Sequence, residues 1–410
     1  MFIFKGEKEM NKLDKIFSSF ISNNLFKNKS VLQSNYTPEQ ITHREAQVEA
    51  VASILAPALR GERVSNLFVY GNTGSGKTLS VQYVRDKILE KLKEMGENYL
   101  QFIYVNCKLK KVADTEYRIV AEMIHELKGT IPATGLPTDQ VYLKFIELID
   151  VKKQVVIIIL DEIDEAVKKI SDRFIYTLTR LNSELKNAQI SIIGISNSLT
   201  FMDNIDPRVR SSLSEEELVF PSYNALQLQD ILRIRSLQAF KEGVLAEGVI
   251  EKCAAYAARE HGDARRALDL LRVAGELTER ENEKKIRVEH IDTANQKIEK
   301  DKMLDIVEKV PKQFQLVLAA TVALHKNKEV EEIFTGDVYN AYQDLCEKTR
   351  NEVLTQRRVS DILGEFDMLG LINTRVISKG RQGRTREIKL MLPPVVLEKA
   401  EEMLHKSLYL

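Results

Sequence analysis

The chain has 410 residues, of which 44% are hydrophobic and 29% charged, and its formal net charge is zero. This length predicts two or three globular domains with buried cores. Because the net charge is zero, the chain as a whole does not attract nucleic acid. Any binding of nucleic acid must therefore come from local basic patches. Cys107, Cys253 and Cys346 lack metal-ligand spacing and predict reduced, buried thiols in a cytoplasmic protein. No apolar run reaches the length of a membrane span, so no membrane partner is expected.

The N-terminal half alternates between strand-like and helical patterns. Residues 1–35 carry a weak apolar pattern, which predicts a short helix followed by a mobile arm. Thr42-His43-Arg44-Glu45 is a capping-box pattern that predicts a helix running to about Leu59. The strand-like runs that follow, separated by helical stretches, are 66–70, 101–106, 155–160 and 190–195. This alternation predicts βαβ units and a parallel sheet.

A glycine-rich segment, Gly71-Asn72-Thr73-Gly74-Ser75-Gly76-Lys77-Thr78, separates the first strand from a helical stretch at 79–95. It fits a phosphate-binding P-loop at every constrained position. The glycines let backbone N–H groups surround phosphate oxygens, and the helix N-terminus adds partial positive charge. Lys77 is placed to reach the β- and γ-phosphates, and the Thr78 hydroxyl is placed to hold Mg²⁺. The segment therefore predicts an ATP or ADP site with Mg²⁺.

The β-branched run 155–160 predicts a strand buried on both faces, and it ends in Asp161 and Glu162. Open α/β sheets place ligands at this end of their strands. Alone, these acids also fit the first turn of a helix. Together with the P-loop, they predict that Asp161 holds Mg²⁺ and that Glu162 is the general base for the attacking water. The pair of motifs indicates an ATPase.

Two further segments offer polar groups to the same site. Asn197 ends the next apolar strand, where its amide either orients the water or contacts the γ-phosphate, or is an ordinary strand-to-turn asparagine. Gly262-Asp263 predicts a helix cap with Arg265 and Arg266 in the first turn. Cations there oppose the helix dipole, so an anion such as a nucleotide phosphate is expected, with a plain surface helix as the alternative.

Arg208 and Arg210 follow Pro207 on a helical turn. From spacing alone they suit two situations equally well. They either reach the phosphate of a nucleotide on a neighbouring subunit, as an arginine finger does, or lie on a solvent-exposed helix.

The C-terminal half changes pattern after Pro221. Residues 224–300 read as amphipathic helices, and the charge-dense segment 297–305 reads as a linker or a solvated helix end. From Val310 onward, helices precede two strand-like segments, 371–378 and 386–392, joined by a glycine-bearing basic turn. This order predicts a winged-helix module.

The predicted wing has a net charge of +5 over residues 373–390, with Glu387 as its one acid. Beside it, a helix over 351–369 begins with side chains suited to phosphates and base edges. A charged hairpin that only keeps the chain soluble is the alternative. The residues predicted to contact DNA are Arg357, Arg358, Ser360, Lys379, Arg381, Arg384 and Arg386.

Over roughly residues 36–400, these motifs resemble the AAA+ ATPases, and more narrowly the archaeal origin-recognition initiators, which are similar to eukaryotic Orc and Cdc-type replication proteins. The resemblance implies an α/β AAA+ core with a parallel sheet, an α-helical lid and a C-terminal winged helix. The implied ranges are 1–35 for an N-terminal arm, 36–222 for the core with a helical insertion near 113–149, 223–300 for the lid and 301–410 for the winged helix.

The resemblance also implies roles for individual residues. Asn197 looks like sensor 1, Arg265 like sensor 2 and Arg208 like the arginine finger, while Tyr223 and Arg235 would help hold the nucleotide. The turn at 134–137 resembles the tip of an insertion that contacts duplex DNA in such proteins.

These features together lead us to expect an ATP-dependent replication initiator that binds origin duplex DNA. ATP binding and slow hydrolysis would act as a switch, and the partners would be a replicative helicase and paralogous initiators. It would be cytoplasmic and associated with the nucleoid. The alternatives are a clamp-loader-like machine, whose winged helix docks protein, and a signalling ATPase, whose winged helix binds regulatory DNA.

Overall fold

The structure is a computed structural model that describes residues 24–34, 36–108, 115–132, 135–213, 215–327, 332–378 and 384–409. The chain forms two compact units, divided after Ile291. Cys107, Cys253 and Cys346 are buried free thiols, as predicted. Among the described residues, no helix combines the length and the apolar character that a membrane crossing requires.

The first unit contains a five-stranded parallel sheet in the order β2-β3-β4-β1-β5. The strands are β1 (Asn66–Tyr70), β2 (Leu100–Asn106), β3 (Gln154–Asp161), β4 (Ala188–Ser196) and β5 (Glu215–Val219). The predicted parallel sheet and its four strands are confirmed. The fifth strand was not predicted, because its sequence Glu-Glu-Glu-Leu-Val is poor in strand-forming residues and pairs only with β1, at the sheet edge.

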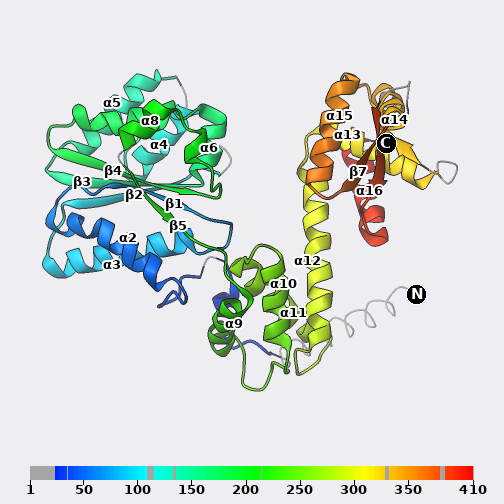
Figure 1. The fold of residues 1–410 in the computed structure, drawn as a ribbon, viewed down its shortest axis with the longest axis horizontal. Helices are drawn as coiled ribbons and strands as arrows, with labels where there is room; N and C mark the ends of the chain where they lie inside the picture. The colour runs from blue at the N-terminus through cyan, green and yellow to red at the C-terminus, as the bar shows by residue number, and fades with distance from the viewer. Residues whose placement is uncertain are drawn as a thin grey trace, which may run out of the picture. The chain divides into compact units, whose positions relative to one another are not determined.

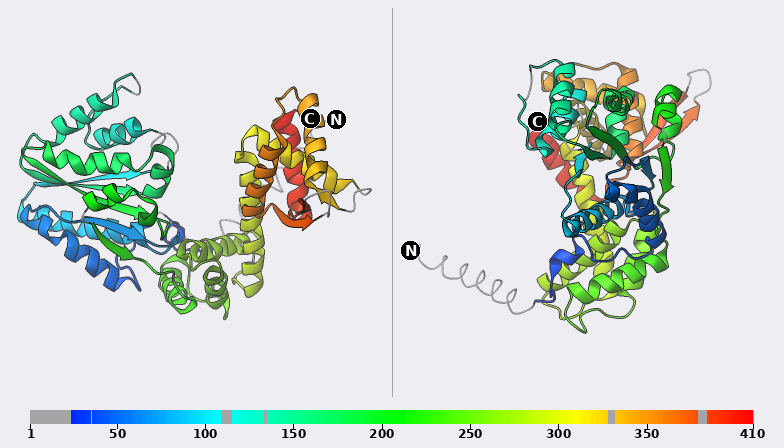
Figure 2. Two further views of the ribbon diagram at one scale, coloured as in Figure 1. Left: turned by 45° about the horizontal axis from the view of Figure 1, so that its top comes forward. Right: turned by 90° about the vertical axis from the view of Figure 1, so that its left-hand side faces the viewer.

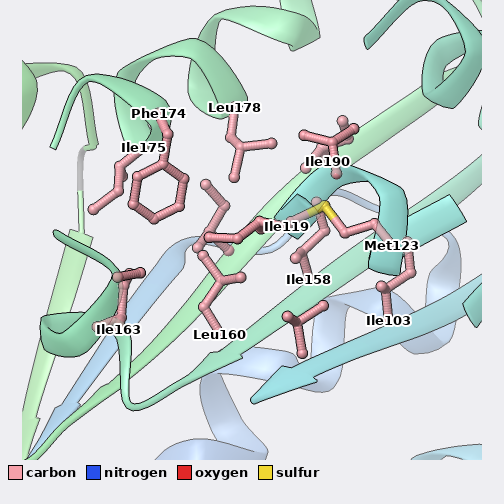
Figure 3. Close-up of a cluster of buried hydrophobic side chains, with 14 of the residues drawn as sticks. Ile103, Ile119, Met123, Ile158, Leu160, Ile163, Phe174, Ile175, Leu178 and Ile190 are labelled. Carbon is pink, nitrogen blue, oxygen red and sulfur yellow. The ribbon is translucent and has the colours of Figure 1, made fainter. Parts of the chain in front are cut away.

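Helices cover both faces of this sheet (Figures 1 and 2). One face carries α2 (Glu45–Leu55), η2 (Ala56–Arg60) and α3 (Lys77–Met95). The other carries α4 (Glu116–Glu126), α5 (Thr138–Ile149), α6 (Ile163–Ile170), α7 (Arg173–Arg180), η3 (Leu181–Ser183), η4 (Met202–Asn204) and α8 (Pro207–Leu213). Figure 3 shows side chains of α4 and α7 packed against Ile158 and Leu160 of β3. Burial on both faces explains the uninterrupted apolar run of β3.

The start of α2 differs from the predicted capping box. The N-cap is Arg44, and its side chain does not cap the helix. Glu45 Oε1 accepts a hydrogen bond from the backbone N–H of His43 (3.1 Å) rather than from that of Thr42. His43 has a left-handed backbone (φ 62°), which turns the chain before the helix. The helix ends at Leu55, and a 3-10 turn continues to Arg60.

The first unit also contains the predicted helical segment after the sheet. Its elements are α9 (Ala225–Ala239), α10 (Val249–Arg259), α11 (Ala264–Arg280) and the beginning of α12 (Val288–Lys309). Residues 24–34, including η1 (Lys29–Leu32), pack on these helices. Phe26 stacks on Phe240 with ring centroids 4.8 Å apart, and the Leu25 N–H donates to Glu279 Oε1 at 2.8 Å. The prediction of a mobile arm is therefore wrong for 24–34, while the helix predicted before it lies outside the described residues.

The second unit contains the remaining helices and a small antiparallel sheet in the order β6-β8-β7. Its elements are α13 (Lys312–Lys326), β6 (Ile333–Phe334), α14 (Thr335–Lys348), α15 (Gln356–Met368), β7 (Ile372–Ser378), β8 (Arg384–Leu390) and α16 (Pro394–Leu408). This arrangement confirms the winged helix. The charge-dense segment 297–305 is not a linker, because it lies inside α12.

Candidate nucleotide site

Three sequence motifs meet at the carboxyl edge of the sheet. In register, Tyr70 of β1 pairs with Ser196 of β4, and Asp161 of β3 pairs with Ile195 of β4. Because parallel strands end on the same side, the P-loop, Asp161 and Asn197 all leave the sheet at this edge. Residues that are far apart in the sequence are therefore close together in the fold.

Lys77 is held inside the P-loop by three oxygens. Its Nζ donates to the carbonyls of Gly71 (2.7 Å) and Asn72 (2.9 Å) and to Oδ1 of Asn197 (2.9 Å). Burial lowers the pKa of Lys77 to about 8, in spite of the opposing attraction of Asp161, and Arg265 lowers it further. A buried ammonium group held by neutral oxygens is prepared for a ligand with negative charge.

Asp161 is fixed by hydrogen bonds from three sides. The Thr78 hydroxyl donates to Oδ2 at 3.0 Å, and the Tyr104 hydroxyl donates to the same oxygen at 2.7 Å. The backbone N–H of Glu162 donates to Oδ1 at 3.0 Å. A hydroxyl and a carboxylate this close together are the hard oxygen ligands that Mg²⁺ takes, so these residues fit the ion.

Glu162 separates β3 from α6 and has a left-handed backbone (φ 55°). Such a conformation is unusual for a residue other than glycine and is found preferentially at functional sites. Its side chain lines the same cavity as Lys77, and Oε2 lies 3.0 Å from the Nζ of Lys108.

A cavity of about 400 Å³ lies between the sheet edge and the helices that follow it. At one end it is lined by Thr73, Gly74, Gly76, Lys77, Thr78, Asp161, Glu162, Asn197 and Arg265. At the other end it is lined by residues 33–34, 36 and 38–42, and by Ile231, Ile234 and Arg235, while Tyr223 lies beside Gly76 of the P-loop. The P-loop, Lys77 and Arg265 suit phosphates, and Tyr36, Ile41, Ile231 and Ile234 give apolar surface for the rest of a nucleotide.

Two of the residues at the far end support that match. The Arg235 guanidinium lies 4.5 Å from the Tyr36 ring, and its buried NH1 group has no hydrogen-bond partner among the described residues. A buried donor without a partner is costly unless a ligand supplies an acceptor. Tyr36 and its neighbours were missed in the sequence analysis, because nothing local links this segment to a site.

Tyr104 was also missed. It lies near the carboxyl end of β2, opposite Ile159 of β3, and that position was the available signal. The side chain reaches Asp161 only because β2 and β3 are neighbours, which the strand runs alone do not reveal.

The predicted cap of α11 is confirmed, since Asp263 Oδ1 accepts from the backbone N–H groups of Arg265 (2.8 Å) and Arg266 (3.3 Å). Arg265 thereby lines the cavity. By contrast, Arg208 of α8 is exposed and does not line it. Its neighbour Arg210 lies 3.3 Å from Glu217 of the adjoining strand.

The basic residues predicted to contact DNA belong to the second unit. Arg357 and Arg358 are exposed in the first turn of α15, which Thr355 caps. Arg386 donates from NH1 to the Ser360 carbonyl at 3.2 Å and so joins β8 to that helix. Lys379 and Arg381 lie outside the described residues, and Arg384 is the first residue of β8.

Known protein families match all three parts of the chain: the sheet-containing core, the helices after it and the winged helix. Family models match as an AAA ATPase domain (residues 40–192), a Cdc6 AAA+ ATPase-type lid domain (229–296) and a CDC6 C-terminal winged helix domain (305–400). The chain is 50% identical over 397 residues to an ORC1-type DNA replication protein of Pyrococcus abyssi, covering 95% of this chain and 93% of the relative. It is 48% identical over 393 residues to one of Archaeoglobus fulgidus, covering 96% and 94%.

Among solved structures, the Aeropyrum pernix ORC1 protein in complex with DNA matches with a TM-score of 0.84 and 42% identity, covering 93% of this chain and 97% of that one. The resemblance noted in the sequence is thus confirmed. With half of its residues identical to such relatives over nearly its full length, the chain belongs to the family of archaeal ORC1-type DNA replication proteins, AAA+ ATPases with a Cdc6-type lid and winged helix.

Proposed function

We propose that this protein is a cytoplasmic, ATP-dependent replication initiator that binds origin duplex DNA and helps to recruit or load the replicative helicase. The observation that carries the proposal is the cavity in which the P-loop, Asp161 and the first turn of α11 come together. The exposed basic residues of the winged helix supply a second surface for DNA. The solved ORC1 relative from Aeropyrum pernix, described as a complex with DNA, supports the same assignment.

In the proposed complex, the P-loop from Gly71 to Lys77 surrounds the phosphates, and Lys77 exchanges its present oxygens for those of the nucleotide. Mg²⁺ held by Thr78 and Asp161 would neutralise part of the negative charge on the phosphates. Tyr223, beside Gly76, and Arg235, beside Tyr36, help to hold the nucleotide.

Glu162 accepts the proton of the attacking water, while Asn197 and Arg265 respond to the γ-phosphate. Slow hydrolysis is part of this proposal, and the ion pair of Glu162 Oε2 with the exposed Lys108 is a contact that competes with water for the carboxylate. Hydrolysis then serves as a switch between two bound states. Arg208, exposed on α8, would contact a nucleotide on an adjacent initiator.

On DNA, α15 would lie in the major groove, with Arg357, Arg358 and Ser360 at its N-terminal end. The wing, including Lys379, Arg381, Arg384 and Arg386, would follow the backbone or the minor groove. The turn at 134–137, between α4 and α5, would form the second contact; its first residue, Thr134, lies outside the described residues.

Nucleotide affinity should depend on pH through Lys77. The pKa of Lys77 is lowered to about 8, and phosphate oxygens stabilise its charged form, so the complex has a higher pKa than the free protein. Below about pH 8 the affinity should therefore be constant, and above it the affinity should fall by up to about tenfold per pH unit. Calorimetric titration with ATP between about pH 7 and about pH 9.5 measures this. Lys77→Arg stays charged and should remove the dependence, whereas a flat wild-type profile would contradict it.

DNA affinity should depend on the basic residues of the winged helix. Arg357→Ala and the triple change Arg381→Ala, Arg384→Ala and Arg386→Ala should weaken binding to origin duplexes and reduce the log–log salt slope by about 0.9 for each phosphate that is no longer neutralised. Footprinting and titration with ATP or ADP present measure both quantities. Arg280→Ala, an exposed change in the lid, is the matched control. Unchanged duplex binding by the triple variant would instead favour a winged helix that docks protein, as in a clamp-loader-like machine.

A further inference from the structure

Arg44 is a buried cation that the nucleotide site described above does not account for. Its relative exposure is 2%, although it directly precedes a surface helix. Burial lowers its pKa, yet a guanidinium group stays charged in proteins. Among the described residues it forms no ion pair with a carboxylate. Burial of a charged group costs desolvation free energy, which the hydrogen bonds to its partners must offset.

Those partners are backbone carbonyls from distant parts of the chain. The Nε group donates to the carbonyl of Ser75 in the P-loop at 2.8 Å. One terminal nitrogen donates to the carbonyl of Pro221, in the connection between β5 and α9. The other donates to the carbonyl of its neighbour His43 at 3.0 Å. One rigid, planar group therefore joins the P-loop to the segment that leads into the lid.

The bond to Ser75 fixes the orientation of a P-loop peptide unit. In a trans peptide, the C=O and the following N–H point in opposite directions. Because Arg44 holds the Ser75 carbonyl on its own side, the Gly76 N–H points to the other side. Gly76 lines the cavity and is the N-cap residue of α3, at the helix end where N–H groups receive phosphate oxygens.

The face of the same guanidinium fixes Tyr223. The Cζ atom of Arg44 lies 3.8 Å from the centroid of the Tyr223 ring, and Tyr223 itself lines the cavity. The Tyr223 hydroxyl lies close to Gly76, since a Cβ atom added to Gly76 would be 2.9 Å from that oxygen. Arg44 thus supports both the phosphate-binding turn and the aromatic side chain beside it.

We propose that Arg44 is a positioning residue that holds the Ser75–Gly76 peptide and Tyr223 in the conformation that binds a nucleoside diphosphate or triphosphate. The inference rests on the proposed nucleotide-binding function. Because P-loop backbone N–H groups hold the inner phosphates, loss of Arg44 should weaken ADP and ATP equally. Loss of a group that reads the γ-phosphate, the role proposed for Arg265, should weaken ATP alone.

The test compares Arg44→Gln, which removes the charge, and Arg44→Lys, which keeps the charge but loses the planar set of donors. Affinities for fluorescent ADP and ATP, KM and kcat, and the melting temperature of the free protein are measured. We expect Arg44→Gln to lose about tenfold in affinity for both nucleotides and Arg44→Lys to lie between it and the wild type. The loss should appear in KM more than in kcat. Arg63→Gln is the matched control, because Arg63 also donates to a backbone carbonyl, but that of Ile190 in β4 (3.1 Å) and not one of the P-loop.

Hydrogen exchange of the P-loop amides adds a readout that a change in global stability does not reproduce. It should be faster in Arg44→Lys at an unchanged melting temperature, and this variant decides the question if Arg44→Gln fails to fold. Wild-type affinity for ADP in folded Arg44→Lys and Arg44→Gln would overturn the inference, and so would a loss confined to ATP. A wild-type chain that binds neither nucleotide would overturn the proposed function itself.

Discussion

Glu162→Gln is expected to bind ATP with wild-type affinity and to hydrolyse it at least about 10²-fold more slowly, because general-base catalysis contributes that much or more. The substitution keeps the size of the side chain but removes its ability to accept the proton of water. The hydrogen bond from the Glu162 backbone N–H to Asp161 Oδ1 (3.0 Å) does not involve the side chain and should persist. Single-turnover phosphate release together with an ATP titration measures the two effects separately.

The control for this variant lies three residues further along the chain, in the first turn of α6. Glu165→Gln changes a carboxylate of α6 whose Oε1 lies 2.6 Å from Lys168 Nζ and which does not line the cavity. It should hydrolyse ATP at the wild-type rate. Normal hydrolysis by Glu162→Gln would refute the role of Glu162 as base, and equal losses in the two variants would point to a disturbed helix α6.

The sequence was sufficient for the parts of the site that have a local signature. The P-loop was predictable because its glycines stand between a strand and a helix, the one context in which they form an anion site. Asp161 and Glu162 were predictable because the apolar run before them has the composition of a strand buried on both faces. The cap of α11 by Asp263 is likewise a local pattern, and the structure contains it.

The remaining parts depend on contacts between distant segments. Nothing near Arg44 in the sequence indicates that its side chain donates to Ser75 and Pro221, which lie 31 and 177 residues away. The ordered packing of residues 24–34 could not be predicted for the same reason. Their few apolar side chains are buried only because the lid helices cover them. Sequence patterns indicate the structure that a segment favours by itself. The roles of Arg44 and of residues 24–34 depend instead on segments that are distant in the sequence.

Gly74→Ala is expected to lower nucleotide affinity by about 10²-fold, as the sum of a strained backbone and a collision. Gly74 has a φ of +73°, and an added Cβ atom would lie 1.8 Å from Oδ1 of Asp263 and 3.0 Å from its Cα. The carbonyl of Gly74 also accepts from the N–H of Ala264 at 3.3 Å. The methyl group must therefore displace either the P-loop or the first turn of α11, and with it Arg265. Fewer molecules are then competent to bind, and titration with fluorescent ADP and ATP measures the loss.

Gly96→Ala separates the two causes. Gly96 has the same φ of +73°, but nothing lies within 4 Å of its added Cβ atom. It should lower the melting temperature through backbone strain and leave nucleotide affinity unchanged. Adding Asp263→Ala to the Gly74→Ala variant removes the colliding carboxylate and should restore part of the affinity, although α11 loses its cap. If Gly74→Ala binds like Gly96→Ala, or if the second change restores nothing, the close contact between the P-loop and the lid helix is not what binding requires.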